Sequence, residues 1–323
     1  MRPLFTLSLS DIVISALGKA GYHKCEELFE GNIEYQQKAL DILKSFNLNF
    51  DDIKALMQGP GAITAAQLLR NEQMNEQIPT FSESLDKILG GGVQVGSLLQ
   101  ICGPPGSGKT QLVLQLCVNV QLPCALGGLE SESVFIDTES TFSVDRLREI
   151  ASGASYHCSK VASIYNLKED MTNFTPDAVL AGVHYFEVEN ILKFMSVIEQ
   201  LFELVRINKK IKCIVIDSFT FPFLRITNHI DRTRYISMII QKLQDLALEH
   251  SVAIILNNHL TTKISQEIKV LAPALGESFS HAIPNTLLLG IVDNSFSAVM
   301  YKSYKLAEEV VLFKICSLGI RDI

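Results

Sequence analysis

Residues 103–110 have the sequence Gly103-Pro104-Pro105-Gly106-Ser107-Gly108-Lys109-Thr110. They match the phosphate-binding pattern G-x-x-x-x-G-K-[ST] at every defined position. The apolar run 98–102 before them is typical of a buried strand, and residues 111–120 after them carry apolar side chains at helical spacing. A strand, a glycine-rich loop and a helix in this order predict a site that binds the phosphates of a nucleoside triphosphate.

Each part of this loop suits that role physically. Its glycines let backbone N–H groups turn inward around phosphate oxygens, and the helix that follows points its positive end at the same place. Lys109 can reach the outer phosphates, and the Thr110 hydroxyl can bind Mg²⁺. We therefore predict that the loop residues and Gln111, the next residue, contact the nucleotide.

Two acidic residues follow apolar, strand-like runs farther along the chain. Asp217 ends the run 211–217, where it suits the carboxylate that holds Mg²⁺ through Thr110 or through water. Glu139 follows the run 133–137, where it could act as a general base toward an attacking water. The alternatives are structural: an aspartate that caps the next turn, and a glutamate that is solvated on the surface.

Asn258 and His259 follow another apolar run, 252–256, and could detect the γ-phosphate by hydrogen bonding. For His259 the alternative is an ordinary solvated loop histidine. Strands that alternate with helices predict a mostly parallel α/β sheet, in which ligands bind beyond the carboxyl ends of the strands. We therefore expect these two residues, Glu139, Asp217 and the phosphate loop to meet at one edge of the sheet.

The bulk composition limits the classes of protein that this chain can represent. Its 323 residues suffice for one large domain and a small one, and 47% of them are hydrophobic, as in a globular protein with a substantial core. The net charge of −7 argues against a duplex-binding surface over the whole molecule. Any contact with nucleic acid then needs a local basic patch, or else the partner is another protein.

Cysteine usage and apolar runs indicate the compartment. The chain has seven cysteines and no C-x-x-C spacing, so we expect no zinc site and a reducing environment. Ser10 and Asp11 interrupt the apolar residues near the N-terminus, which argues against a signal peptide. No apolar run approaches the roughly 20 residues that span a bilayer, so we expect a soluble protein with no membrane partner.

Residues 1–60 predict a small all-helical N-terminal domain. The helix-start signal Ser8-x-x-Asp11 precedes apolar residues on one helical face. The G-x-x-G turn from Gly18 to Gly21 could place backbone N–H groups on a phosphate, as helix-hairpin-helix units do. The shortness of the unit and its few basic residues favour the alternative, a plain helical bundle in which a glycine ends the helix.

Residues 61–78 form a linker, and residues 79–323 form the large domain. The linker's apolar segment, 62–69, could dock on a neighbouring subunit or pack on its own domain. Within the large domain we expect a long polar loop at 261–284. An antiparallel sheet edge is expected from the strand-like runs 286–292, 298–301 and 310–315.

The motifs in this order resemble the RecA/RadA recombinase family. They are the phosphate loop, Phe135-Ile136-Asp137-Thr138-Glu139 and Ile214-Val215-Ile216-Asp217-Ser218. Phe221-Pro222-Phe223 and the stretches 261–264 and 273–278 are similar to the eukaryotic recombinase paralogues, most closely the C paralogue. The resemblance implies a RecA-like P-loop ATPase core over residues 79–323 and, loosely, the family's helical N-terminal domain.

The resemblance also implies roles for individual residues. ATP and Mg²⁺ would bind at a subunit interface, with Glu139 as the catalytic glutamate, Lys109 at the phosphates and Arg146 stacked on the adenine. Residues 219–230 and 261–284 fall where the family's two DNA-binding loops lie. The candidate phosphate-contacting cations in or beside these loops are Arg225, Arg232, Lys263 and Lys269.

Three departures from the family pattern bear on the function. His259 stands where a filament-forming recombinase has glutamine, no arginine lies near Thr286, and the linker segment 62–66 has no phenylalanine, although Ile63 or Leu68 could replace it. They favour an ATP-binding, DNA-dependent ATPase with weak hydrolysis, which acts in homologous recombination and double-strand break repair within a hetero-oligomeric mediator complex. Its partners would be other recombinase paralogues, single-stranded DNA and recombination intermediates.

Two other functions stay open at this stage. One is a strand-exchange recombinase that assembles on its own into filaments, and the other is a nucleotide-gated scaffold with little hydrolysis. The resemblance implies a nuclear location, with a cytoplasmic pool as a further expectation.

Overall fold

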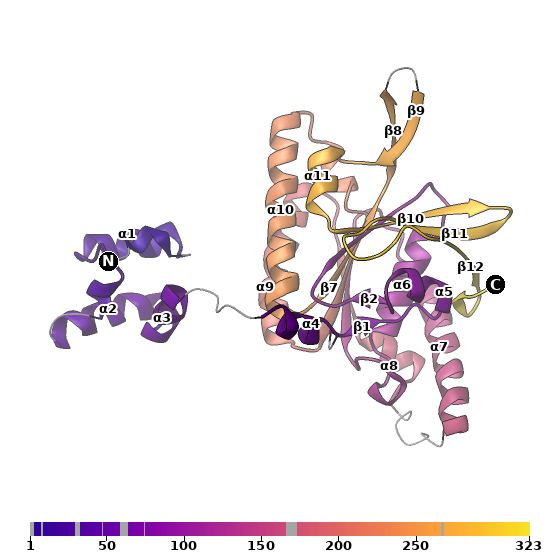
Figure 1. The fold of residues 1–323 in the computed structure, drawn as a ribbon, viewed down its shortest axis with the longest axis horizontal. Helices are drawn as coiled ribbons and strands as arrows, with labels where there is room; N and C mark the ends of the chain where they lie inside the picture. Colours follow the sequence, from indigo (N-terminus) through magenta and orange to yellow (C-terminus); the bar gives the residue numbers. More distant parts are fainter. Residues whose placement is uncertain are drawn as a thin grey trace. The chain divides into compact units, whose positions relative to one another are not determined.

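The computed structural model describes residues 3–7, 9–29, 33–46, 48–58, 64–73, 75–165, 173–265 and 268–323. The chain divides into two compact units, Met1–Met74 and Asn75–Ile323 (Figure 1). Each unit has buried hydrophobic clusters of its own. Throughout the described ranges, every helix is too short or too polar to cross a bilayer.

The N-terminal unit is helical, as the sequence predicts. Its helices are α1 (Asp11–Lys19), α2 (Ile33–Ser45), α3 (Phe50–Gln58) and α4 (Ala65–Gln73), with short 3-10 helices at Leu4–Thr6 and Glu26–Leu28. Leu17, Leu43 and Ile53 are fully buried and bring the first three helices together. Gly21 adopts a left-handed φ of 99° just after α1, which is the conformation of a glycine that ends a helix.

Two parts of the N-terminal predictions fall partly outside the described residues. Ser8, the first residue of the expected helix-start signal, lies outside the described residues, and α1 begins after Ser10. Ile63, which could dock on a neighbouring subunit, also lies outside the described residues. Leu68, on α4, is 48% exposed, and Leu69 beside it is 56% exposed.

A nine-stranded sheet forms the centre of the second unit, in the order β13-β12-β11-β10-β3-β7-β6-β4-β5. The six strands from β10 to β5 in this order run parallel, and β10 to β13 pair antiparallel. This confirms the expected parallel α/β core and its antiparallel edge. The strands are β3 (Leu98–Cys102), β4 (Glu132–Asp137), β5 (Val183–Glu187), β6 (Ile211–Asp217), β7 (Ala253–Asn258), β10 (Asn285–Val292), β11 (Ser295–Lys302), β12 (Val310–Cys316) and β13 (Gly319–Arg321).

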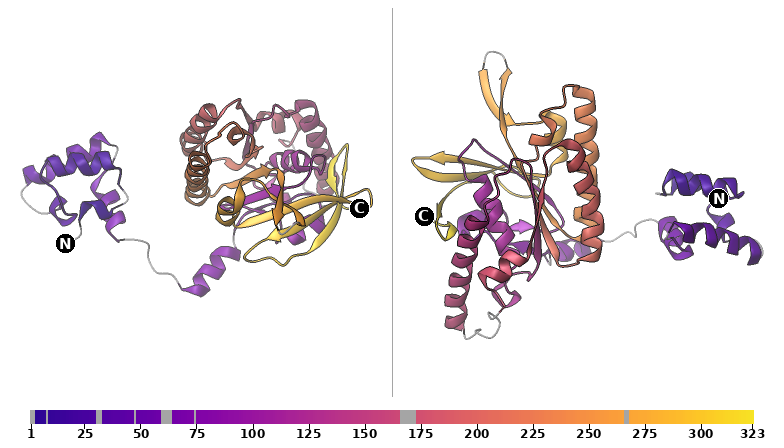
Figure 2. Two further views of the ribbon diagram at one scale, coloured as in Figure 1. Left: turned by 90° about the horizontal axis from the view of Figure 1, so that it is seen from above. Right: turned by 180° about the vertical axis from the view of Figure 1, so that it is seen from behind.

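Helices cover both faces of this sheet, as Figures 1 and 2 show. Successive side chains of a strand point to opposite faces, so each strand supplies two separate cores. On one face, side chains such as Ile101, Phe135 and Val215 pack with a group of four helices: α5 (Glu83–Ile88), α6 (Lys109–Asn119), α7 (Val144–Tyr165) and α8 (Pro176–Ala181). On the other face, Ile214 and Leu256 pack with α9 (Ile191–Ile207), α10 (His229–His250) and α11 (Gly276–Ala282).

The prediction of a long polar loop at 261–284 is wrong. Residues in it form an antiparallel hairpin of β8 (Leu260–Ser265) and β9 (Ile268–Pro273), followed by α11. The hairpin projects beyond the carboxyl ends of the parallel strands (Figure 1). The β-branched residues Thr261, Thr262 and Ile264 favour this extended pairing, although the overall polarity of the segment suggests a loop.

The segment 153–185, which has no clear sequence pattern, contains three elements. Helix α7 continues to Tyr165, and α8 and β5 follow Thr175. A small separate sheet of β1 (Gln77–Ile78) and β2 (Val93–Gln94) flanks α5. The phosphate loop lies between β3 and α6, with β7 and β6 as the next strands of the sheet.

Candidate nucleotide-binding site

The phosphate loop connects the buried strand β3 to the first turn of α6. Gly108 has φ 90° and forms the N-cap of α6, and Gly106 has φ 79°. A Cβ on Gly108 would lie 2.6 Å from Ile315 Cδ1, and one on Gly103 would lie 2.7 Å from the carbonyl oxygen of Leu289. The loop therefore needs glycine at 106 for its conformation, at 103 for its close packing and at 108 for both reasons.

Lys109 lies at the N-terminus of α6 with its side chain turned toward the loop. Its Nζ donates to the carbonyl oxygens of Gly103 at 2.9 Å and Pro104 at 3.1 Å. Burial lowers the pKa of Lys109, and the charges of Asp217 and Glu139 act in the opposite direction. The ammonium group is thus held by weak neutral acceptors beside two carboxylates, where a phosphate would be a better partner.

Thr110 and Asp217 bring the loop and the end of β6 together. Thr110 Oγ1 donates to Asp217 Oδ2 at 2.7 Å. Asp217 is 5% exposed, and burial raises its pKa despite the hydrogen bond from Thr110. A buried carboxylate whose charge has so little solvation is a group that a cation would stabilise.

Asn257, at the end of β7, is a site residue that the sequence analysis missed. It is fully buried, and its amide acts on Asp217 by lowering that carboxyl's pKa. Even so, neither polar atom of its side chain has a hydrogen-bond partner of normal geometry within the described part of the chain, and the same is true of Ser107 Oγ. Buried polar atoms of this kind usually have a partner, so the two side chains mark a place for a polar ligand.

These residues fit Mg²⁺ and a nucleotide by their chemistry. Mg²⁺ prefers oxygen ligands, and Thr110 and Asp217 offer a hydroxyl and a carboxylate at one point beside the loop. No cluster of three His, Cys, Asp or Glu side chains suited to a metal occurs among the residues described.

Glu139 is presented by a turn that Asp137 organises. The buried Asp137 carboxylate accepts hydrogen bonds from the backbone N–H groups of Glu139, Thr141 and Phe142, at 3.1, 3.2 and 2.9 Å. Tyr185 also donates to Asp137, at 3.3 Å. The Asp137 carboxylate therefore fixes the backbone of the turn after β4, and the turn holds Glu139 near the loop.

The Glu139 carboxylate is hydrogen-bonded to the two neighbouring strand ends. Its Oε1 accepts from Ser218 Oγ at 2.5 Å and from His259 Nε2 at 2.6 Å. The hydrogen bond from His259, followed by that from Ser218, holds the pKa of Glu139 below its ordinary value, although burial acts in the opposite direction. Glu139 is thus an ionised carboxylate at neutral pH, as a general base must be.

Asn258 is not brought to the loop. It lies on β7 with Ile254 and Leu256, and these residues face α9 and α10 on the side of the sheet away from α6. Its fully buried amide accepts from Thr220 Oγ1 and donates to the carbonyl oxygen of Ala274 at 3.2 Å. The expectation that Asn258 detects the γ-phosphate does not match this placement, and the period of two along β7 assigns the inward position to Asn257 instead.

Arg146, on α7, joins three elements next to the loop. Its guanidinium donates to Gln111 Oε1 at 2.7 Å and to the carbonyl oxygens of Cys316 and Ser317 at 2.7 and 2.9 Å. It also pairs with Glu149 at 2.7 Å. Both expected nucleotide contacts, Arg146 and Gln111, therefore lie together at the start of α6, with the guanidinium plane held in place.

An apolar hollow of about 250 Å³ adjoins the loop on this side. Its walls are Gly106, Gly108, Lys109, Thr110 and Gln111, together with Phe296 from β11 and Ile315 from β12. The antiparallel edge of the sheet thus contributes side chains to the phosphate loop. Sequence patterns gave no sign of this, because more than 180 residues separate Phe296 from the loop.

The four expected DNA-contacting cations lie on two neighbouring segments. Arg225 is exposed after the 3-10 helix Phe221–Phe223, and Arg232 on α10 lines a cleft of about 450 Å³ with Thr261 and Glu277. Lys263 is placed on β8, and Lys269 on β9. These segments follow β6 and β7, whose ends also hold Asp217 and His259.

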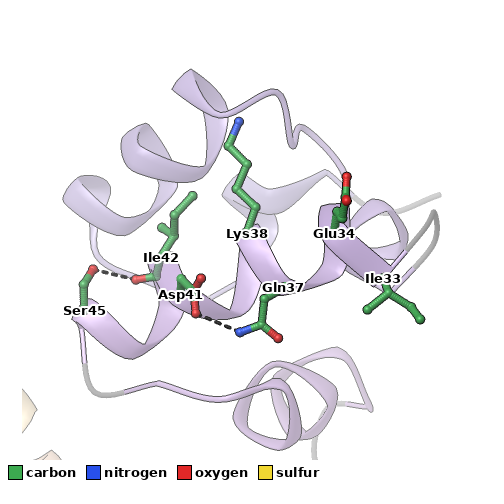
Figure 3. A pocket seen from close by; sticks show the side chains of 7 residues that line it. All are labelled: Ile33, Glu34, Gln37, Lys38, Asp41, Ile42 and Ser45. Atoms are coloured by element: carbon green, nitrogen blue, oxygen red, sulfur yellow. Dashed lines mark hydrogen bonds between the residues drawn. The ribbon is translucent and has the colours of Figure 1, made fainter.

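The N-terminal unit carries a groove of about 680 Å³ along α2, shown in Figure 3. Ile33 is 85% exposed at one end of it. Two of its polar side chains are locally paired: Gln37 donates to Asp41 at 2.9 Å, and Ser45 donates to the carbonyl oxygen of Ile42 at 2.6 Å. Neither the groove nor the Gly18 to Gly21 turn shows a set of side chains aimed at a phosphate.

Comparison with known proteins agrees with this geometry. The Rad51 family profile matches residues 70–323. The DNA repair protein RAD51 homolog 3 of Cricetulus griseus is 33% identical over 99% of this chain and 92% of its own length. The DNA repair protein RAD51 homolog 2 of Homo sapiens is 30% identical over 71% of this chain and 64% of its own length. The DNA repair and recombination protein RadA of Aeropyrum pernix is 32% identical over 60% of this chain and 57% of its own length.

Proposed function

The chain belongs to the Rad51 family, and on that premise we propose that it is an ATP-binding recombinase paralogue that acts in homologous recombination and DNA double-strand break repair. It would bind ATP with Mg²⁺, hydrolyse it slowly in a DNA-dependent way, and work as one subunit of a hetero-oligomeric mediator complex. The names of its relatives, which are DNA repair and recombination proteins, support the biological role.

The observation that carries the catalytic part is the meeting of three strand ends at the phosphate loop. Thr110 contacts Asp217 at 2.7 Å after β6, Asn257 lies between them on β7, and Glu139 follows β4. The charges of Asp217 and Glu139 both raise the pKa of Lys109, and the charge of Lys109 lowers that of Glu139. A metal ligand, a phosphate-binding lysine and an ionised carboxylate at one point are the parts that phosphoryl transfer to water requires.

The proposed chemistry assigns one task to each of these side chains. Lys109 would give up its hydrogen bonds to the two loop carbonyls and bind phosphate oxygens instead. The loop N–H groups would bind the other phosphate oxygens. Thr110 and Asp217 would hold Mg²⁺, which neutralises charge on the phosphate oxygens when bound. Glu139 accepts a proton from the attacking water as the oxygen bonds to the γ-phosphorus and the bond to the β-phosphate oxygen breaks.

The proposed contact with single-stranded DNA and recombination intermediates uses the two segments beyond β6 and β7. Arg225, Arg232, Lys263 and Lys269 are the cations that would meet phosphates there. Since the whole chain carries a net charge of −7, this local patch would have to supply most of the electrostatic attraction. Glu277 in the same cleft as Arg232 moderates that attraction.

The proposed partners are other recombinase paralogues. The exposed apolar side chains Leu68 and Leu69, on α4, suit docking on a neighbouring subunit. This helix lacks the phenylalanine that the resemblance implies for a self-assembling filament, which favours a hetero-oligomer. We further propose a nuclear location with a cytoplasmic pool, in keeping with a DNA repair role.

A nucleotide-gated scaffold with little hydrolysis is the second candidate. It is favoured by one observation, namely that Glu139 Oε1 already accepts two hydrogen bonds, from Ser218 and His259. A carboxylate held in this way is a weaker base toward water. The two functions differ in whether hydrolysis, rather than binding alone, is needed for activity.

Two substitutions test the proposal on the purified full chain. Lys109→Ala should weaken binding of a fluorescent ATP analogue by about 10- to 100-fold, the range for losing charge-assisted hydrogen bonds. Glu139→Gln should keep that binding and abolish DNA-stimulated phosphate release. Exposed Lys314→Ala is the matched control for charge. Equal phosphate release by Glu139→Gln and wild type would favour the scaffold instead.

A further inference from the structure

We propose that Asn257 is a positioning residue for the Asp217 carboxylate, and that it takes up this role when Mg²⁺ and a nucleotide are bound. In the free protein its buried amide has no hydrogen-bond partner among the described residues, which lowers the stability of the fold. The inference rests on the proposed function, because it concerns the carboxylate assigned to Mg²⁺ at the same site. Asn257 acts through Asp217 and does not touch the nucleotide.

The placement of Asn257 follows from the register of two parallel strands. Val215 of β6 pairs with Ile255 of β7, and both side chains pack on the face of the sheet that α6 covers. Because side chains alternate along a strand, Asp217 and Asn257, two residues farther on, lie next to each other on that same face. Thr110, in the first turn of α6, donates to Asp217 there at 2.7 Å. The amide of Asn257 is therefore adjacent to the carboxylate.

The side chain of Asn257 is unsatisfied although its carbonyl oxygen is not. The residue is fully buried, and within the described ranges neither Nδ2 nor Oδ1 has a hydrogen-bond partner of normal geometry. Its carbonyl oxygen accepts from the N–H of Phe219 at 2.8 Å. A buried amide without partners destabilises a protein, so an apolar side chain such as that of Ile255 would serve the free fold better.

The next residue shows that this strand satisfies an amide where the fold uses one. Asn258 is equally buried, and its side chain accepts from Thr220 and from the N–H of His259 and donates to the carbonyl oxygen of Ala274 at 3.2 Å. The two asparagines thus have the same chemistry, the same burial and neighbouring positions. Since Asn258 supports the free fold and Asn257 does not, the reason for Asn257 lies in another state of the site.

That state is the one with a cation beside Asp217. Asp217 is 5% exposed, and burial raises its pKa, while the hydrogen bond from Thr110 and the neighbouring amide of Asn257 lower it. A cation at this point favours the charged carboxylate, and a buried charged carboxylate needs donors that stabilise and orient it. The amide N–H₂ of Asn257 is an unused donor beside it. Replacing a group that orients a metal-binding side chain typically lowers metal affinity by about 10- to 100-fold.

Asn257→Val and Asn257→Thr separate this role from a structural one, since the two new side chains have nearly the same shape and only threonine carries a donor. In urea unfolding of the full chain without ligand, Asn257→Val should unfold at the same urea concentration as wild type or at a higher one. Asn258→Val is the matched control and should unfold at a clearly lower concentration, because Thr220 and the carbonyl oxygen of Ala274 lose their partner. If Asn257→Val unfolds as early as Asn258→Val, the amide supports the free fold and the inference is wrong.

The Mg²⁺ requirement of nucleotide binding provides the second measurement, made with a fluorescent ATP analogue over a series of Mg²⁺ concentrations. The concentration for half-maximal binding should rise about tenfold in Asn257→Val, stay nearer to wild type in Asn257→Thr and be unchanged in folded Asn258→Val. Binding in EDTA should be equal in wild type and Asn257→Val, because the phosphate loop itself is intact. An equal Mg²⁺ requirement in wild type and Asn257→Val would overturn the inference and leave the proposed function standing. A wild type that binds no nucleotide would overturn both.

Discussion

Thr110 Oγ1 donates a hydrogen bond to Asp217 Oδ2 at 2.7 Å, across 107 residues of sequence. Thr110 lies on α6 after β3, and Asp217 ends β6, so the contact spans β7, the strand between them in the sheet. The side chain at the end of β7 on this face is Asn257, which is why a buried amide lies beside the carboxylate. The proposed magnesium site thus depends on three adjacent strands and on no single motif.

Asp217→Asn tests this metal site. The amide keeps the volume and the acceptor for Thr110 but removes the charge, so the Mg²⁺ concentration for half-maximal ATP binding should rise at least about tenfold. Isothermal titration with and without Mg²⁺ measures it, and Asp245→Asn, on the exposed side of α10, is the control. An unchanged Mg²⁺ requirement would mean that the ion is held by other groups.

Arg146→Ala should destabilise the fold as well as weaken nucleotide binding. The side chain is largely buried and joins Gln111 to the carbonyls of Cys316 and Ser317, so its loss should cost about 2–3 kcal/mol of unfolding free energy. Arg146→Lys should recover only part of the lost unfolding free energy, because an ammonium cannot satisfy this planar set of acceptors.

Urea unfolding with and without ATP separates the two effects of Arg146. Arg206→Ala, which removes an exposed ion pair with Glu203, should change stability by less than about 1 kcal/mol. Should Arg146→Ala retain full stability and lose only ATP affinity, the residue would serve the nucleotide alone.

The four candidate DNA cations predict a change in salt dependence. On single strands, each lost phosphate contact lowers the slope of log affinity against log salt by about 0.7. Removing Arg225 and Arg232 together should reduce it by about 1.4, and removing Lys263 and Lys269 by a similar amount. Fluorescence anisotropy with labelled oligo-dT over a salt series measures the slope, with Lys193→Ala on α9 as the control. A slope equal to that of wild type would exclude these residues from phosphate contact.

Asp86 predicts a pH dependence of stability. Burial, the largest cause, raises its pKa from 3.8 to about 6, although the N–H of Thr80 donates to its carboxylate at 2.8 Å. The folded state therefore holds more protons than the unfolded state between about pH 4 and 6, and stability falls as the pH rises through this window.

Asp86→Asn should remove the part of the pH dependence of stability that this carboxyl causes. The loss of unfolding free energy between pH 4 and pH 7 should shrink by on the order of 2–3 kcal/mol relative to wild type, as a pKa shift of this size implies. Denaturant unfolding at the two pH values provides the comparison, and Asp245→Asn should leave it unchanged. If Asp86→Asn and wild type lose the same amount, Asp86 is not the buried acid responsible.

The positions of the phosphate loop, Asp217 and Glu139 at the ends of strands could be predicted from sequence because each is a local pattern: an apolar strand followed by a chemically specific residue. The parallel sheet followed from the alternation of such strands with helices. In the same way, the antiparallel edge was visible as three short apolar runs. These features depend on residues close together in the chain.

The parts that could not be predicted depend on which face a side chain occupies or on distant contacts. Asn257 and Asn258 are adjacent and chemically identical, and only the packing of Ile254 and Leu256 against α10 shows which one faces the loop. The contact of His259 with Glu139 joins residues 120 positions apart. The β8–β9 hairpin is a separate two-stranded sheet, so it does not belong to the alternation of strands and helices that predicts the central sheet.

Size-resolved light scattering tests the central claim most directly, with ATP, Mg²⁺ and single-stranded DNA present and with or without a candidate recombinase paralogue. We predict that the chain alone stays small and that it forms a defined hetero-oligomer with the paralogue, which Lys109→Ala weakens. Long assemblies formed by the chain alone, or a monomer that binds neither ATP, DNA nor paralogue, would contradict the account.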